Sequence, residues 1–170
     1  MALSQMTGML RDHDRNSKYE AAIAAAVKRF STEHGRPPVV LDIGAGTGLL
    51  SMLAVRAGAE RVYACEMFAA MADVAREVTQ LNCPGKIEVF AKKSTELRVV
   101  TPLDGGQEQE EEGGGVLPQR ADMVVMEVFD SALLGEAVLP AMRHALKELL
   151  VSSDGISKQI NLFFDSTYLF

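Results

Sequence analysis

The sequence predicts an α/β fold, a doubly wound and mainly parallel sheet with helices on both faces. Short apolar runs typical of buried strands alternate along the chain with longer segments of helical periodicity. The first apolar run breaks into three alternating glycines, as a tight turn from a strand into a helix allows. Because strands joined through helices pair in parallel by right-handed crossovers, these elements should form one layered domain.

Composition limits the class of protein. The 170 residues, 48% of them hydrophobic, suffice for one well-buried domain. The formal net charge of -6 argues against a protein that binds nucleic acid through phosphate contacts, which would need a basic face. No window approaches the roughly 18 consecutive apolar residues of a membrane span, and no signal peptide is recognisable. We expect a cytoplasmic or nuclear protein in which Cys65 and Cys83 are reduced thiols, with no metal site.

The first expected element is a helix that begins near residue 16. Ser17 and Glu20 form a possible capping box at its start, and Gly35 ends it. One helical stripe is apolar and should face the sheet. It consists of Tyr19, Ile23, Val27 and Phe30.

Strands and helices then alternate to the end of the patterned region. We expect strands at 39–43, 61–65, 86–91 and 121–129, and helices at 47–58, 67–81 and 139–150. His144, in the last helix, should be a solvated surface residue. Between the last two strands, the glycine- and glutamate-rich segment at about 102–118 cannot bury enough surface to offset chain entropy, so we expect a disordered acidic insertion.

The glycine turn "DIGAGTG" at 42–48 is the first candidate for a binding site. Glycines let a backbone approach a ligand closely and present the free amides of the next helix, although a tight turn without a ligand is the simpler alternative. Leu49 stands where the dinucleotide fingerprint needs its third glycine, which makes a nicotinamide-dependent oxidoreductase a distant reading. Glu66, at the end of the second strand, can accept both hydroxyls of a ribose, or it is a solvated strand-end residue.

These residues carry a resemblance to a known family. "VLDIGAGTGLLS" followed by "VYACE" resembles the Rossmann-like cofactor-binding half of class I S-adenosylmethionine-dependent methyltransferases. "MLRDHDRNSKY" at 9–19 and "MEVFDSALLGE" at 126–136 are similar to the protein arginine methyltransferase family, most of all to its seventh-numbered, monomethylating (type III) branch, with the ninth-numbered member a near second. The resemblance covers about residues 9–150.

The resemblance implies S-adenosyl-L-methionine as the cofactor and assigns residues to it. Arg15 would hold the methionine carboxylate, which suits the forked donors of a guanidinium, and Met9 would lie near the sulfur. Glu66 would bind the ribose hydroxyls, and Thr95 stands where many members carry a glutamate that holds the adenine amine. The first cofactor loop would contain Asp42, Gly44 and Gly46.

The resemblance also makes Glu127 and Glu136 the catalytic pair. A cationic guanidinium must attack the methyl group of a cationic sulfonium, so two carboxylates can grip the substrate, aim one nitrogen and offset the repulsion. The alternative is a strand-end carboxylate plus one in the first turn of a helix. The loop between the two glutamates lacks the aromatic and methionine residues of dimethylating members, which favours monomethylarginine as the product.

The first functional hypothesis is therefore methyl transfer from S-adenosylmethionine to arginines of proteins such as histones or glycine- and arginine-rich proteins. We expect a helical cofactor lid at 1–36, the cofactor-binding domain at 37–150 and an atypical tail at 151–170. The chain resembles a form truncated before the family's β-barrel, which leaves dimerisation open. The second hypothesis is a non-catalytic cofactor-binding or interaction protein derived from such an enzyme.

Overall fold

The centre of the computed structural model, which describes residues 3–100, 115–127 and 138–151, is a four-stranded parallel sheet in the order β3-β2-β1-β6. A second, two-stranded parallel sheet joins β4 to β5. The strands are β1 (Val39–Ile43), β2 (Arg61–Cys65), β3 (Ile87–Phe90), β4 (Arg98–Val99), β5 (Val116–Leu117) and β6 (Met123–Met126). The predicted α/β fold with a mainly parallel sheet is confirmed.

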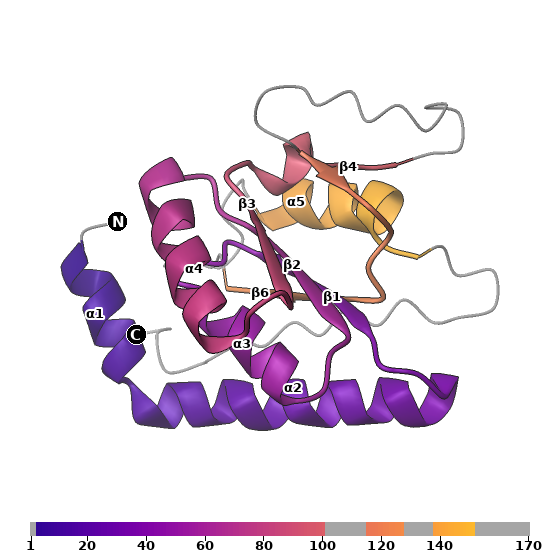
Figure 1. The fold of residues 1–170 in the computed structure, drawn as a ribbon, viewed down its shortest axis with the longest axis horizontal. Helices are drawn as coiled ribbons and strands as arrows, with labels where there is room; N and C mark the ends of the chain where they lie inside the picture. The colour runs from indigo at the N-terminus through magenta and orange to yellow at the C-terminus, as the bar shows by residue number, and fades with distance from the viewer. Residues whose placement is uncertain (1–2, 101–114, 128–137, 152–170) are drawn as a thin grey trace.

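The helices cover both faces of this sheet. α2 runs along one face beside α3, and α5 lies on the other (Figure 1). The helices are α1 (Leu3–Arg11), α2 (His13–His34), α3 (Leu49–Arg56), α4 (Ala69–Asn82) and α5 (Val138–His144), with a 3-10 turn η1 (Ser94–Glu96) and a π-helical turn η3 (Ala145–Leu149). Within the described ranges, no helix is both long enough and apolar enough to cross a membrane.

Two apolar cores follow from the period of two along the strands. Val39, Leu41 and Ile43 of β1 point toward the α5 side, whereas Val40 points toward α2 and α3. All five residues of β1 are buried, as expected for a central strand with helices on both faces. The predicted stripe of α2 is confirmed, because each of its side chains is at most 4% exposed: Tyr19, Ile23, Val27 and Phe30.

The start of α2 differs from the prediction. Asp12 is the N-cap, and its side chain accepts a hydrogen bond of 3.0 Å from the backbone N–H of Arg15. The capping box that we expected at Ser17 and Glu20 is therefore wrong, since both residues lie exposed inside the helix. The end is as predicted, because Gly35 caps the helix in the left-handed conformation with φ of 67°.

The expected acidic insertion cannot extend to residue 118. Val116 and Leu117 form β5 beside β4, and Leu117 is completely buried in the core on the α5 side. Residues 101–114 and 152–170 lie outside the described part, so the disorder of the insertion and the character of the tail stay predictions.

A charged clamp fixes the amino ends of β1 and β6. The Asp122 carboxylate, 5% exposed, accepts hydrogen bonds from both terminal nitrogens of Arg36 at 2.8 and 2.6 Å and from the backbone N–H of Val39 at 2.8 Å. The carboxylate also raises the pKa of the Arg36 guanidinium. At the other end of the sheet, Ile43 lies opposite both Cys65 and Met126, so the loops that follow these strands leave from one edge.

Candidate active site

The glycine loop between β1 and α3 is tied to the end of β2. The backbone N–H groups of Gly44 and Ala45 donate to the Cys65 carbonyl at 2.9 and 3.1 Å. Gly44, Gly46 and Gly48 have φ of 78°, 56° and 87°, in the left-handed region where a side chain is strained. No side chain caps the start of α3, so its first amides face the loop.

Gly48 has a role in the packing of the helices. A Cβ at this position would lie 2.5 Å from Cγ2 of Thr79 on α4. Thr79 cannot easily turn away, because its hydroxyl donates to the Ala75 carbonyl at 2.7 Å and its side chain is buried. Gly48 is thus required for α3 to pack closely against α4, with or without a ligand at the loop.

Glu66 reaches back over the glycine loop from the end of β2. Its Oε2 accepts the N–H of Gly46 at 3.0 Å, and its Oε1 accepts the N–H of Phe68 at 2.9 Å. These two bonds hold the carboxylate in one orientation and leave each oxygen with a further lone pair. With 7% of its surface exposed, Glu66 is not the solvated strand-end residue of the simpler reading, and a diol can bind the same group.

Asp42 lies fully buried beneath the loop. Its Oδ2 accepts the Ser51 hydroxyl at 2.6 Å, whereas Oδ1 has no hydrogen-bond partner within the described residues. Burial raises the pKa of the carboxyl to about 6, against the lowering effect of the Ser51 hydrogen bonds and with a smaller raising effect of Glu66. Sequence reasoning missed Ser51, although a serine in the first turn of an apolar helix was a usable signal.

Cys65 shares this environment. Burial, helped by the negative charge of Asp42, raises the pKa of its thiol to about 12. The thiol is therefore protonated near neutral pH, which makes it a poor nucleophile.

Arg15 and Glu127 form an ion pair across 112 residues of sequence. Nε of Arg15 donates to Oε1 of Glu127 at 3.0 Å, and a terminal nitrogen of Arg15 contacts Oε2. The guanidinium, 3% exposed, also donates to Oδ1 of Asn16 at 2.6 Å and lies 4.8 Å from the ring centre of Tyr19. The structure thus joins the residue expected to bind the cofactor to a residue expected to bind the substrate.

The end of α1 is fixed beside Arg15 through Asn16, which sequence reasoning also missed. The Asn16 amide donates to the carbonyls of Met9 and Leu10 at 3.2 and 3.1 Å. Met9 itself is partly exposed, as a residue that contacts a ligand would be.

The other two predicted site residues are less informative. Thr95 lies exposed on η1, after the carboxyl end of β3, and its role stays a prediction. Glu136 lies outside the described residues.

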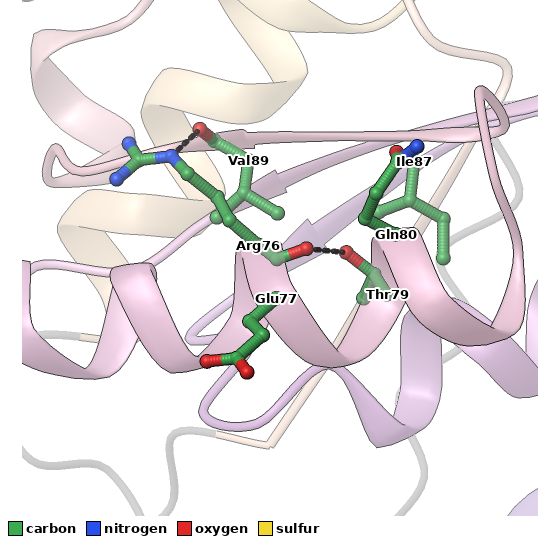
Figure 2. A pocket seen from close by; sticks show the side chains of 6 residues that line it. All are labelled: Arg76, Glu77, Thr79, Gln80, Ile87 and Val89. Carbon is green, nitrogen blue, oxygen red and sulfur yellow. Dashed lines mark hydrogen bonds between the residues drawn. The ribbon is translucent and has the colours of Figure 1, made fainter.

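An open hollow between α4 and β3 is not this site. Figure 2 shows Arg76 reaching across it, where Nε donates to the Val89 carbonyl at 3.2 Å. Its lining contains none of the predicted site residues: Arg76, Glu77, Thr79, Gln80, Ile87 and Val89. Across the described ranges, no group of three or more His, Cys, Asp or Glu side chains could hold a metal ion.

The sequence of this chain is similar to those of known methyltransferases. A family model described as "Ribosomal protein L11 methyltransferase (PrmA)" matches residues 24–134. The chain is also 45% identical over 151 residues to protein arginine N-methyltransferase 7 of Cricetulus longicaudatus, and 44% identical over 151 residues to that of Danio rerio. These matches cover 88% of this chain and 20% of each relative, so the chain spans about a fifth of their length.

Solved structures agree with these relatives. The Trypanosoma brucei PRMT1 enzyme-prozyme complex with AdoHcy superposes with a TM-score of 0.67 at 26% identity, covering 88% of this chain and 40% of that one. Arabidopsis thaliana protein arginine methyltransferase 10 gives a TM-score of 0.64 at 25% identity, covering 88% of this chain and 36% of that one.

Replacement of Gly48 by alanine should destabilise the fold more than the same change at Gly35. Both glycines have positive φ, which costs an alanine about 1–2 kcal/mol, but only Gly48 also meets a side chain. Urea denaturation of Gly48→Ala and Gly35→Ala measures the difference. Adding Thr79→Ser, which removes Cγ2, should recover the packing share of the loss in a double-mutant cycle. Equal losses at the two glycines would contradict the packing argument.

Asp42→Asn should change the pH dependence of stability. Because the native pKa of about 6 lies above the ordinary 3.8, the folded protein binds the extra proton between these values, so wild-type stability falls as pH rises through this window. Asparagine can still accept the Ser51 hydrogen bond and does not titrate. The free energy of unfolding of the variant relative to wild type should therefore rise by up to about 3 kcal/mol between pH 4 and pH 7. Parallel pH profiles from chemical denaturation would refute the buried, titrating carboxyl.

Proposed function

This chain belongs to the protein arginine methyltransferase family, and from that premise we propose that it binds S-adenosylmethionine at the carboxyl edge of its sheet. We further propose that it serves methyl transfer to arginine side chains of proteins. The observation that supports this function best is the ion pair between the buried Arg15 and the partly exposed Glu127 at this edge of the sheet. Arg15, which would hold the cofactor, and Glu127, which would hold the substrate, fix each other's position through this ion pair.

The residues at this edge fit the cofactor in chemistry and order. The forked donors of Arg15 suit the carboxylate of the methionine part, and the lone pairs that Glu66 keeps suit the ribose hydroxyls. Beneath the loop, Oδ1 of Asp42 is a buried acceptor without a partner within the described residues, which suits a site that receives a donor group. Thr95 on the η1 turn is exposed, so its side chain is accessible to a base that extends beyond Glu66.

Arg15 positions Glu127 for the substrate. When bound, S-adenosylmethionine supplies the methyl group on a sulfonium. Arg15 engages both oxygens of Glu127, which fixes the plane of the carboxylate, and each oxygen keeps a lone pair that can accept an N–H of the substrate guanidinium. Held in this way, the attacking nitrogen has a restricted orientation toward the methyl carbon.

Charge balance explains why one glutamate is not enough. Arg15 compensates the negative charge of Glu127, so this pair alone cannot offset the repulsion between the substrate guanidinium and the sulfonium. We assign the second negative charge to Glu136. With the loop composition noted above, we propose monomethylarginine as the product and arginines of glycine- and arginine-rich proteins or histones as the substrates.

Calorimetric titration with S-adenosylmethionine tests the cofactor site. The chain should bind it, and Glu66→Ala should weaken binding by about tenfold or more, since the ribose loses its acceptor. Glu88→Ala is the matched control, because Glu88 is an exposed carboxylate on the neighbouring strand β3 and should leave the affinity unchanged. A folded chain that binds no cofactor, or whose affinity ignores Glu66, would refute the assignment.

Methyl transfer to a glycine- and arginine-rich peptide tests the catalytic pair. Glu127→Gln keeps the size of the side chain but removes the charge, so turnover should fall on the order of 100-fold or more while the variant stays folded. Mass spectrometry should show one methyl group per modified arginine, and a matched lysine peptide should stay unmodified. If the wild-type chain binds the cofactor but transfers no methyl group, the non-catalytic interaction protein becomes the better reading.

A further inference from the structure

We propose that His144 is a positioning residue that fixes the η1 turn, where the base of the cofactor would lie, to the helix that follows the catalytic loop. The inference rests on the proposed cofactor site and extends it to a side chain outside that site. It would make recognition of the base depend on the placement of α5.

His144 joins two segments that are 47 residues apart. Its ring Nε2 lies 2.9 Å from the backbone carbonyl oxygen of Leu97. A carbonyl only accepts hydrogen bonds, so Nε2 carries the hydrogen and donates, whether the ring is neutral or charged. The half-buried ring is thus not the solvated histidine that the sequence suggested, and that expectation is wrong.

The carbonyl that His144 binds belongs to the end of η1. The N–H of Leu97 closes the turn on the Ser94 carbonyl at 3.3 Å, and the Leu97 side chain, 2% exposed, is anchored in the core that also contains Ala141 and Ala145 of the α5–η3 segment. The hydrogen bond and the apolar contact therefore hold the turn from the same side. Just after the turn, the N–H of Arg98 donates to the Gly115 carbonyl at 2.9 Å, which holds the chain toward β5. Without the histidine, the turn would lose its hydrogen bond to α5 and keep the apolar contact with that helix, which has no directional preference of its own.

η1 is the segment that a base attached to a ribose on Glu66 would reach. The N–H of Glu66 donates to the Phe90 carbonyl at 3.0 Å, so the end of β2 lies directly beside the end of β3. η1 follows β3 by a short connection. Since Glu66 would hold the ribose, the base extends over the neighbouring strand end and onto this turn.

α5 follows the proposed catalytic glutamates along the chain and is bonded to the end of η1 through His144. It is the first described helix after Glu127, and Glu136 belongs to the connection between them. Directly after His144 the helix widens into the π-helical turn, which closes through a hydrogen bond of 2.9 Å from the Leu150 N–H to the Ala145 carbonyl. The residue that bonds to the end of η1 is thus the one at which α5 passes into the π-helical turn.

Three variants test this role through the binding of S-adenosylhomocysteine. His144→Leu removes the donor and should weaken binding about fivefold or more, whereas His144→Gln, whose amide can donate to the same carbonyl, should bind nearly as wild type does. 5′-Methylthioadenosine keeps the base and ribose but lacks the amino acid. The His144→Leu change should lower the affinity for this compound by the same factor. Amide hydrogen exchange at residues 94–97 should accelerate in His144→Leu and not in His144→Gln.

Met142→Ala is the control for a merely structural effect, because Met142 packs against the same core from the same helix. It should lower the melting temperature without weakening ligand binding. Two results would overturn the proposal. One is that Met142→Ala weakens binding as much as His144→Leu does when both lower the melting temperature equally. The other is that amide exchange at residues 94–97 is unchanged in His144→Leu. If the wild type binds no S-adenosylhomocysteine, the proposed cofactor site fails, whereas the exchange data still decide whether His144 positions η1.

Discussion

The parallel register of the central strands is the constraint on which the whole site depends. Ile43 lies opposite both Cys65 and Met126, so the next residues of the three strands, Gly44, Glu66 and Glu127, start their loops at the same level. The clamp between Asp122 and Arg36 fixes this register from the opposite end of the sheet. A slip of one residue would turn Asp42 to the other face and separate it from Ser51.

The ion pair between Arg15 and Glu127 attaches the start of α2 to that edge of the sheet. A buried guanidinium without a partner would cost several kcal/mol, so the contact with Glu127 holds the first turns of α2 against the end of β6. The same pair holds both groups in one orientation before any ligand arrives. In a methyltransferase this preorganisation would reduce the rearrangement needed when cofactor and substrate bind.

Local patterns were sufficient for most of the fold and for part of the site. The strands and the buried stripe of α2 follow from periods of 2 and 3.6, and the glycine turn marks the end of β1. Partners that come from distant segments have no such pattern, which is why the pairing of Arg15 with Glu127 and the bond from His144 to Leu97 were not predicted. Asp12 and Ser17 are both good cap residues, so the local sequence does not choose between them, and in the structure Asp12 is the cap and Asn16 already belongs to the helix.

The burial of Cys65 has a consequence for redox chemistry. Oxidants and alkylating agents react with the thiolate, and a thiol whose pKa is raised to about 12 offers almost none of it near neutral pH. Cys65 is the last residue of β2 and precedes the glutamate that would bind the ribose, and its side chain lies in the core on the α5 side. Oxidation to a bulky sulfinic acid would therefore disrupt the packing at this end of the sheet. Burial is the main cause of the raised pKa, and the negative charges of Asp42 and Glu66 add to it. The surroundings that shape this edge of the sheet therefore also disfavour oxidation of its thiol.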